Sequence, residues 1–284
     1  MNAPAPFLRA PIAAILFLAL GSAALSQITI IGRWRLGEND SGAGNGVAAI
    51  DPTIDFSGNG WNLNRESTSI TYSSDTPSAS LTPFGASTLS MNFAGTGSYG
   101  GYSIGINGWN ENMPAYANNV VIEAWIKPSD TNAGSREIIG LGTQTSGYQI
   151  MQSGTNLEFR YGTSSAAVYT YSGLTTSAWT YVGLVIDNNQ AALFVNGVSS
   201  PTYSTASMPA LQTTSHYFSI GEMATTPGGE NFVGLIDEAR YFTFNTGTFT
   251  PAMLNYGAIP EPSTWALLLG FGALGGVIWR RRRG

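Results

Sequence analysis

The sequence predicts an all-β protein: an antiparallel two-sheet β-sandwich (jelly roll) with an N-terminal signal peptide and a single C-terminal transmembrane helix. No long stretch repeats apolar residues at helical spacing, which argues against helices in the body of the chain. Short runs rich in Val, Ile, Phe and Tyr recur between clusters of Gly, Asn, Ser and Thr, and 35 of the 284 residues are glycine. Because these runs do not alternate with helices, an antiparallel sheet is favoured over a parallel one.

Six apolar runs are the clearest predicted strands, at residues 120–126, 157–161, 181–186, 191–195, 217–220 and 232–242. In the second run Leu157, Phe159 and Tyr161 alternate with charged residues, as a half-buried strand requires. Residues 187–190, Asp-Asn-Asn-Gln, separate two runs and predict a hairpin turn, since Asn tolerates the left-handed backbone conformation. We expect one β domain over residues 27–258, a size that single sandwiches reach.

The charge distribution excludes several classes of function. Five of the 12 cations are Arg9 and the arginines at 280–283, and one of the 17 acids is Glu261, so residues 27–259 carry 7 cations against 16 acids, a net charge of −9. This acidic body will not attract nucleic acid. The chain has no cysteine and one histidine, His216, which excludes disulfides, thiolate sites and any site with two imidazoles.

The N-terminus has the pattern of a secretory signal peptide over residues 1–26. Arg9 precedes an apolar run at 12–20, which small residues follow up to Ser26. The alternative is an N-terminal anchor helix, but the run is short for a bilayer core that needs about 20 residues. We therefore expect export.

Residues 259–284 contain three features in order. They are a Pro-Glu-Pro tripeptide, an uncharged hydrophobic segment at 264–279 and an arginine cluster, namely Pro260, Glu261 and Pro262, then Arg280, Arg281, Arg282 and Arg283. The uncharged segment is just under the usual length of a membrane-spanning helix, so Ser263 or snorkelling arginines complete the span. The arginines are expected to stay cytoplasmic, which places the residues before Pro260 outside.

This C-terminal segment resembles the PEP-CTERM sorting segment. The resemblance implies an exosortase-type membrane enzyme and the secretion translocon as partners, and cleavage near Pro260 to Pro262. It also implies an inner-membrane intermediate followed by the cell surface or an extracellular matrix as the location. Proteins of this kind are typical of Gram-negative bacteria that make exopolysaccharide. The alternative is a plain membrane anchor.

Four segments of the body resemble, in order, the laminin-G-like (concanavalin A-like lectin/glucanase) jelly-roll family. They lie at residues 32–38 with the loop 55–60 (Asp-Phe-Ser-Gly-Asn-Gly), at 121–128, at 179–182 with 193–197, and at 218–221 with 234–241. The resemblance implies the fold. It leaves the function open, because the fold carries lectins, adhesion modules, enzyme accessory domains and glycosidases.

Two acidic residues inside apolar runs need partners. Glu123 requires a counter-charge or hydrogen bonds if it is buried, and Arg240 or a hydroxyl group is a candidate partner. Asp237 alternates in phase with Leu235, so an inward Leu235 would carry Asp237 inward too. The family resemblance implies one structural calcium ion at matching positions, with Asp55, Asn59, Asp237 and, as a fourth ligand, Glu38. The alternative is a carboxylate held by backbone N–H groups and arginine.

The chain lacks the Glu-x-Asp-x-x-Glu strand of the glucanases with this fold. Asp237 and Glu238 are adjacent, so on a regular strand they point to opposite faces and cannot act on one bond. We expect no catalytic residues.

Aromatic residues in Gly- and Asn-rich stretches are the candidate sugar-binding residues: Trp109, Trp61, Tyr99, Tyr102 and Tyr116. They are equally suited to clamp loops onto the sandwich. The predicted function is a non-catalytic surface or matrix protein that binds polysaccharide or mediates adhesion. The alternatives are a purely structural matrix or biofilm component without a discrete ligand, and a divergent glycoside hydrolase.

Overall fold

The computed structural model describes residues 28–38, 40–65, 69–78, 85–94, 102–103, 118–132, 134–141, 147–161, 168–176, 178–205, 218–221 and 230–256. The chain divides into a compact unit from Ile28 to Ala258 and a second unit made of Met1–Gln27 and Ile259–Gly284. All described residues belong to the first unit, and none of them forms a helix long and apolar enough to span a membrane. The predicted signal peptide and the predicted transmembrane helix lie outside the described residues.

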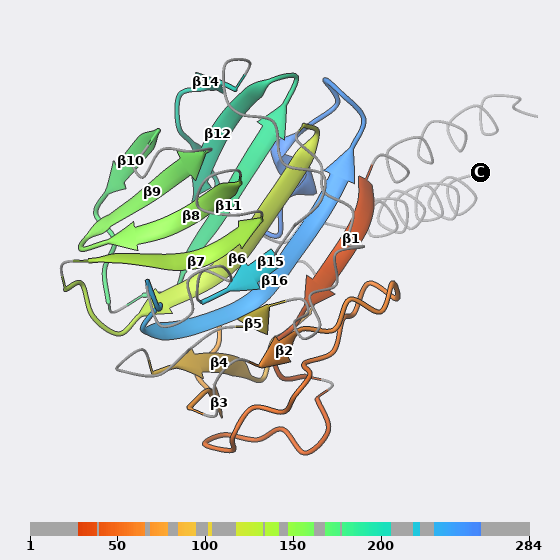
Figure 1. Ribbon diagram of the computed structural model, residues 1–284, viewed down its shortest axis with the longest axis vertical. Helices are drawn as coiled ribbons and strands as arrows, with labels where there is room; N and C mark the ends of the chain where they lie inside the picture. The colour runs from red at the N-terminus through yellow and green to blue at the C-terminus, as the bar shows by residue number, and fades with distance from the viewer. Residues whose placement is uncertain are drawn as a thin grey trace, which may run out of the picture. The chain divides into compact units, whose positions relative to one another are not determined.

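The described strands form two antiparallel sheets (Figure 1). The first sheet has nine strands in the order β13 (Val198–Ser199), β12 (Gln190–Val195), β11 (Thr180–Asp187), β6 (Val120–Pro128), β16 (Gly234–Phe244), β4 (Ser90–Phe93) and β3 (Thr71–Ser73), with β1 (Ile28–Trp34) paired to β16 and β14 (Tyr203–Ser204) paired to β12. The second has seven strands in the order β10 (Tyr169–Ser172), β9 (Asn156–Tyr161), β8 (Tyr148–Ser153), β7 (Ser135–Leu141), β15 (Phe218–Ile220), β5 (Tyr102–Ser103) and β2 (Asn64–Arg65). A short 3₁₀ helix, η3 (Pro251–Met253), follows β16.

The predicted all-β fold is confirmed, and each of the six predicted runs contains or overlaps a strand of this structure. The last run is shifted, because β16 begins at Gly234 and continues to Phe244. The predicted hairpin turn is also confirmed. Strand β11 ends at Asp187 and β12 begins at Gln190, while Asn188 and Asn189 adopt positive φ angles of 49° and 58°.

The main hydrophobic core lies between the two sheets. Strand β6 contributes Ile122, Ala124 and Ile126 to this core, and the second sheet contributes residues such as Ile150 and Phe159. The alternation along β6 places the side chains between these three on the opposite, outer face of the nine-stranded sheet. The core therefore explains only half of the apolar residues in β6.

A second hydrophobic core covers the outer face of the nine-stranded sheet. It includes Val121 and Trp125 of β6 together with Leu254, and Phe249 and Tyr256 pack against it. The C-terminal segment 245–256 therefore lies over the sheet as a strap. Burial on both faces explains why β6 is a nearly continuous apolar run instead of an alternating one.

The strap closes over a buried ion pair. Oε1 of Glu123 accepts a hydrogen bond from Nε of Arg240. Its Oε2 accepts from the hydroxyl of Tyr181 and, at 3.0 Å, from the backbone N–H of Asn255 in the strap. Glu123 and Arg240 are 0% and 1% exposed. Burial raises the pKa of Tyr181 well above its ordinary value, and the carboxylate of Glu123 beside it adds to this effect. Both candidate partners of Glu123, Arg240 and a hydroxyl group, are found in contact with it.

The first prediction concerns this ion pair. Glu123→Leu should lower the free energy of unfolding by about 3–5 kcal/mol, because it leaves the Arg240 guanidinium buried without its counter-charge. The double variant Glu123→Leu/Arg240→Leu should recover a large part of that loss, since neither charge is then stranded. Urea denaturation of the two variants and the unmodified protein measures both effects. A single variant within about 1 kcal/mol of the unmodified protein would contradict the assignment.

Candidate functional site

A β-bulge in β16 brings two acidic side chains together. The pairing of β16 with β6 shifts register between Asp237 and Arg240, and Glu238 has a positive φ of 49°. Ile236 and Ala239 both belong to the main core, which requires one extra residue between them. The expectation that Asp237 and Glu238 point to opposite faces is therefore wrong. The backbone N–H of Glu238 instead donates to Oδ1 of Asp237 at 2.7 Å.

The bulge lies on the outer face of the nine-stranded sheet. Asp237 pairs with Trp125, whose side chain belongs to the second core, while Leu235 is only half-buried and belongs to neither core. The expected inward Leu235 is thus not found, because Ile236 takes the inward position. Asp237 is nevertheless fully buried, at 0% exposure.

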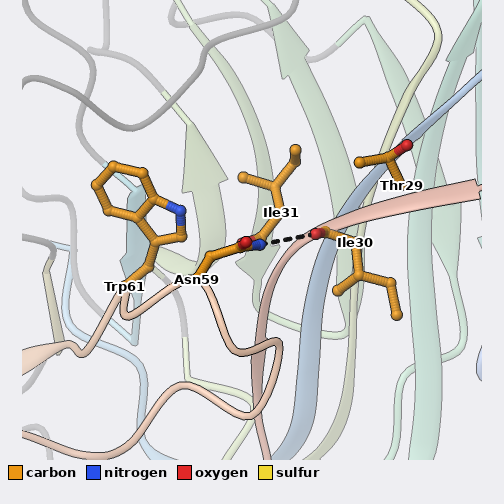
Figure 2. Close-up of a pocket in the computed structure, with 5 residues that line it drawn as sticks. All are labelled: Thr29, Ile30, Ile31, Asn59 and Trp61. Carbon is orange, nitrogen blue, oxygen red and sulfur yellow. Dashed lines mark hydrogen bonds between the residues drawn. The ribbon is translucent and has the colours of Figure 1, made fainter.

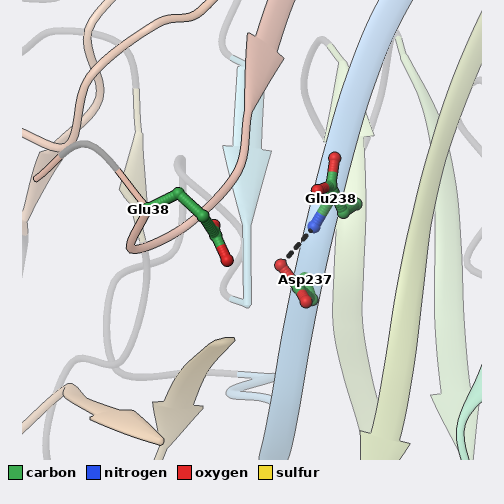
Figure 3. Close-up of side chains that lie close together, drawn as sticks. All are labelled: Glu38, Asp237 and Glu238. Atoms are coloured by element: carbon green, nitrogen blue, oxygen red, sulfur yellow. Dashed lines mark hydrogen bonds between the residues drawn. The ribbon is translucent and has the colours of Figure 1, made fainter. Parts of the chain in front are cut away.

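Glu38, in the segment after β1, completes a group of three carboxylates. One carboxylate oxygen from each of Glu38, Asp237 and Glu238 lies within 4.8 Å of the others (Figure 3). Oε1 of Glu38 is held by the hydroxyl of Ser87 at 2.7 Å and by the backbone N–H groups of Thr88 and Leu89 at 2.6 and 3.0 Å. The segment 87–89 therefore fixes Glu38 over the bulge.

The charges in this carboxylate cluster are only partly balanced. Glu238 accepts hydrogen bonds from Nε of Arg35 at 2.7 Å and from Nη2 of Arg33 at 3.3 Å. In contrast, Oδ2 of Asp237 and Oε2 of Glu38 are buried and have no hydrogen-bond partner in the described part of the chain. Burial raises the pKa of Asp237 well above its ordinary value, and the nearby carboxylates of Glu238 and Glu38 raise it further. The site thus favours a proton or a cation at Asp237.

Two of the four predicted calcium ligands lie apart from this cluster. Asp55 accepts hydrogen bonds through Oδ1 from the N–H groups of Arg33 and Ser57, at 3.0 and 2.8 Å. Its Oδ2 accepts from the Ser57 hydroxyl and the Trp61 N–H, at 2.6 and 3.0 Å. Since its carboxylate already accepts four hydrogen bonds, Asp55 stabilises the conformation of the loop at residues 55–61.

Asn59 also contacts β1 instead of the carboxylate cluster. Its Nδ2 donates to the carbonyls of Ile30 and Ile31, both at 2.9 Å. The structure therefore places Glu38 and Asp237 together and assigns Asp55 and Asn59 to capping the outer edge of β1. Sequence reasoning missed Glu238, Arg33 and Arg35. The sequence did contain a signal for this ion-pair group. Two arginines stand at alternate positions in and just beyond β1, and two adjacent acidic residues stand in a late strand.

A pocket lies beside this capped edge. It is lined by Thr29, Ile30, Ile31, Asn59 and Trp61 and has a volume of ≈ 270 Å³ (Figure 2). The backbone of Trp61 is held on both sides, because its N–H donates to Asp55 and its carbonyl accepts from Nε1 of Trp34 at 2.7 Å. None of the five lining residues is charged.

The other predicted site residues fall on parts of the chain that the structure leaves undescribed. Trp109, Tyr99 and Tyr116 lie outside the described residues, and of Tyr102 only the backbone in β5 is described. His216 and the sorting residues, namely Pro260, Glu261, Pro262, Arg280, Arg281, Arg282 and Arg283, are also outside.

The sequence matches two known families. Residues 98–246 match the model described as concanavalin A-like lectin/glucanases superfamily, and residues 258–283 match the PEP-CTERM protein-sorting motif. A comparison with curated protein sequences finds no significant match.

Solved structures share the fold at low sequence identity. Domain 4 of AbnA, a GH43 extracellular arabinanase from Geobacillus stearothermophilus in complex with arabinotriose, is 18% identical with a TM-score of 0.50, over 80% of this chain and 96% of that one. A mutant of Trypanosoma rangeli sialidase displaying trans-sialidase activity is 13% identical with a TM-score of 0.54, over 80% of this chain and 32% of that one. The binding domain of botulinum neurotoxin serotype G is 10% identical with a TM-score of 0.54, over 79% of this chain and 49% of that one. The chain thus spans nearly all of the first structure but half or less of the other two.

Proposed function

Because the chain belongs to the concanavalin A-like lectin/glucanases superfamily, we propose that it is a non-catalytic, lectin-like surface protein that binds polysaccharide. The PEP-CTERM motif makes it an exported protein, sorted toward the cell surface by an exosortase-type system. The observation that carries the binding role is the pocket at Trp61, where an aromatic ring lines an open, uncharged hollow. Apolar faces of sugar rings stack on such rings.

Two further points support a sugar as the ligand. The arabinanase domain that shares this fold is described in complex with arabinotriose. The remaining aromatic candidates, Trp109, Tyr99, Tyr102 and Tyr116, stay predictions for the same role. An exopolysaccharide in the surrounding matrix is the proposed partner.

The carboxylate cluster does not favour glycoside hydrolysis. Glycosidases place two carboxyl groups on either side of a bond that the substrate brings to them. Asp237 and Glu238 are 0% and 1% exposed, and Glu238 is paired with Arg33 and Arg35. A polysaccharide cannot reach these groups without opening the fold, so we assign them a structural role.

The sorting route follows from the two ends of the chain. The signal peptide at 1–26 directs the chain to the translocon, and the hydrophobic segment 264–279 holds it in the inner membrane with Arg280 to Arg283 on the cytoplasmic side. Cleavage near Pro260 to Pro262 then releases residues 27–258 to the cell surface or matrix.

The second prediction tests this processing. Mass spectrometry of the exported protein should find a C-terminus between residues 258 and 263 and an N-terminus near residue 27. A deletion of Arg280 to Arg283 should leave the protein uncleaved in the membrane fraction. If the exported protein retains Arg280 to Arg283, it is a membrane-anchored protein and the processing step is wrong.

We also propose that the carboxylate cluster holds one structural calcium ion. The residues fit such an ion, because calcium prefers carboxylate oxygens and both Oδ2 of Asp237 and Oε2 of Glu38 are buried without a hydrogen-bond partner among the residues described. Asp237 and Glu38 would be its ligands, with Glu238 beside them. A bound ion would supply the positive charge that favours the ionised form of Asp237.

The third prediction follows from the raised pKa of Asp237. In chelator, Asp237 holds its proton to a higher pH in the folded than in the unfolded protein, so stability should fall as the pH rises above the ordinary carboxyl pKa of about 4. Calcium should reverse this fall, because it binds the ionised carboxylate, and raise the melting temperature by about 5–10 °C at pH near 8 when the ion is at about 100 times its Kd.

Thermal melts with calcium and with chelator, near pH 5 and near pH 8, measure both effects. The control is Asp237→Asn, which keeps the size of the side chain and should lose both the response to calcium and this part of the pH dependence. An unmodified protein that melts at the same temperature with calcium and with chelator has no such site.

The fourth prediction tests the binding function itself. A polysaccharide array probed with the exported protein should give reproducible binding that includes neutral chains such as arabinan, xylan or glucan, without release of shorter products. The controls are the heat-denatured protein and a matched acidic polysaccharide set. Silence across the array would favour a purely structural matrix component. Cleavage of a chain would favour a divergent glycosidase.

A further inference from the structure

Building on the proposed polysaccharide-binding function, we propose that the pocket of Thr29, Ile30, Ile31, Asn59 and Trp61 is a subsite for one uncharged sugar unit, and that the protein therefore selects neutral over uronic-acid chains. The inference concerns where the sugar binds and which chemical class it belongs to. It is independent of the carboxylate cluster.

Three polar atoms around the pocket have no hydrogen-bond partner among the residues that the structure describes. They are Nε1 of Trp61, Oδ1 of Asn59 and Oγ1 of Thr29. Figure 2 shows the Nε1 edge of the Trp61 ring turned toward Asn59 and Ile31, with the Asn59 amide between the ring and the backbone of Ile30. One donor, one acceptor and one hydroxyl beside an apolar floor match the alternating hydroxyl and C–H groups of a sugar ring.

The Asn59 side chain and the backbone of Trp61 are held in place before any ligand arrives. Nδ2 of Asn59 is committed to two carbonyls of β1, which leaves Oδ1 as the free acceptor. The Trp61 backbone is fixed by Asp55 and Trp34, and Asp55 is itself held by Ser57 and Arg33. Because these groups are ordered in advance, binding costs little conformational entropy.

The electrostatics select the class of sugar. None of the five described lining residues is a cation, so beside them the carboxylate of a uronic acid would lose its hydration without gaining a counter-charge. The acidic body, at −9 over residues 27–259, further disfavours an anionic chain at low ionic strength. A neutral hexose or pentose unit meets neither penalty.

The fifth prediction is tested by isothermal titration calorimetry of the exported protein with cellohexaose, xylohexaose, laminarihexaose and hexagalacturonate. At least one neutral hexasaccharide should bind, and hexagalacturonate should bind at least about 10-fold more weakly. Affinity for the neutral chain should change less than about 2-fold when the salt concentration rises from about 50 to about 500 mM, since no charge pair forms.

Substitutions locate the site. Trp61→Ala should weaken binding by at least about 10-fold, Trp61→Phe by about 2- to 5-fold through loss of the N–H donor, and Thr29→Val by about 3-fold. Thr29 is exposed, so Thr29→Val should fold normally even if Trp61→Ala does not. The matched control is Trp179→Phe, which changes a half-buried tryptophan packed against the second core and should leave affinity unchanged.

The failures of the two proposals are distinguishable. If the unmodified protein binds a neutral chain and Trp61→Phe and Thr29→Val leave affinity unchanged, the subsite lies elsewhere and only this inference is overturned. Stronger binding of hexagalacturonate than of every neutral chain overturns the assigned class. If the unmodified protein binds none of the four hexasaccharides but binds a polysaccharide of the array, only this inference is overturned, whereas silence across the whole array overturns the proposed polysaccharide-binding function as well.

Discussion

The backbone pairing of β16 is the interaction on which the rest of the structure depends. This strand pairs with β6 along one side and with β4 and β1 along the other. As the last of the described strands, it therefore connects the first strand, β1, to the middle of the sheet. Both of its faces are buried, one by the main core and one beneath the strap 245–256 and the segments near Glu38. A change in its register would move every side chain on it to the wrong face.

The bulge in β16 is where this constraint is relaxed. One extra residue lets Ile236 and Ala239 both face the core, and the positive φ of Glu238 turns a second carboxylate toward Asp237. Arg33 and Arg35 balance the charge of Glu238, while one buried oxygen on each of Asp237 and Glu38 has no hydrogen-bond partner within the described structure. The balance of buried charge on this outer face therefore depends on a proton or a cation.

The first strand shows how a fold can protect an edge and form a pocket with the same residues. Side chains of Asp55, Ser57 and Asn59 satisfy outward-facing backbone groups of β1, which blocks pairing with another chain. The loop that supplies these side chains also positions Trp61 beside β1. The pocket is thus a by-product of edge protection, held rigid by the same hydrogen bonds.

The sequence by itself determined the β-class of the domain, its longest strands, the turn at Asn188 and Asn189, and the need for a partner at Glu123, because alternation, turn preferences and the cost of a buried charge act locally or along one strand. Its motifs also determined the family and the sorting segment. Only the tertiary structure decided which acids meet. The separation of Asp55 and Asn59 from Asp237, and the approach of Glu238, depend on a bulge and on which loop covers which edge. Such contacts join residues far apart in the chain and leave no periodic signal in the sequence.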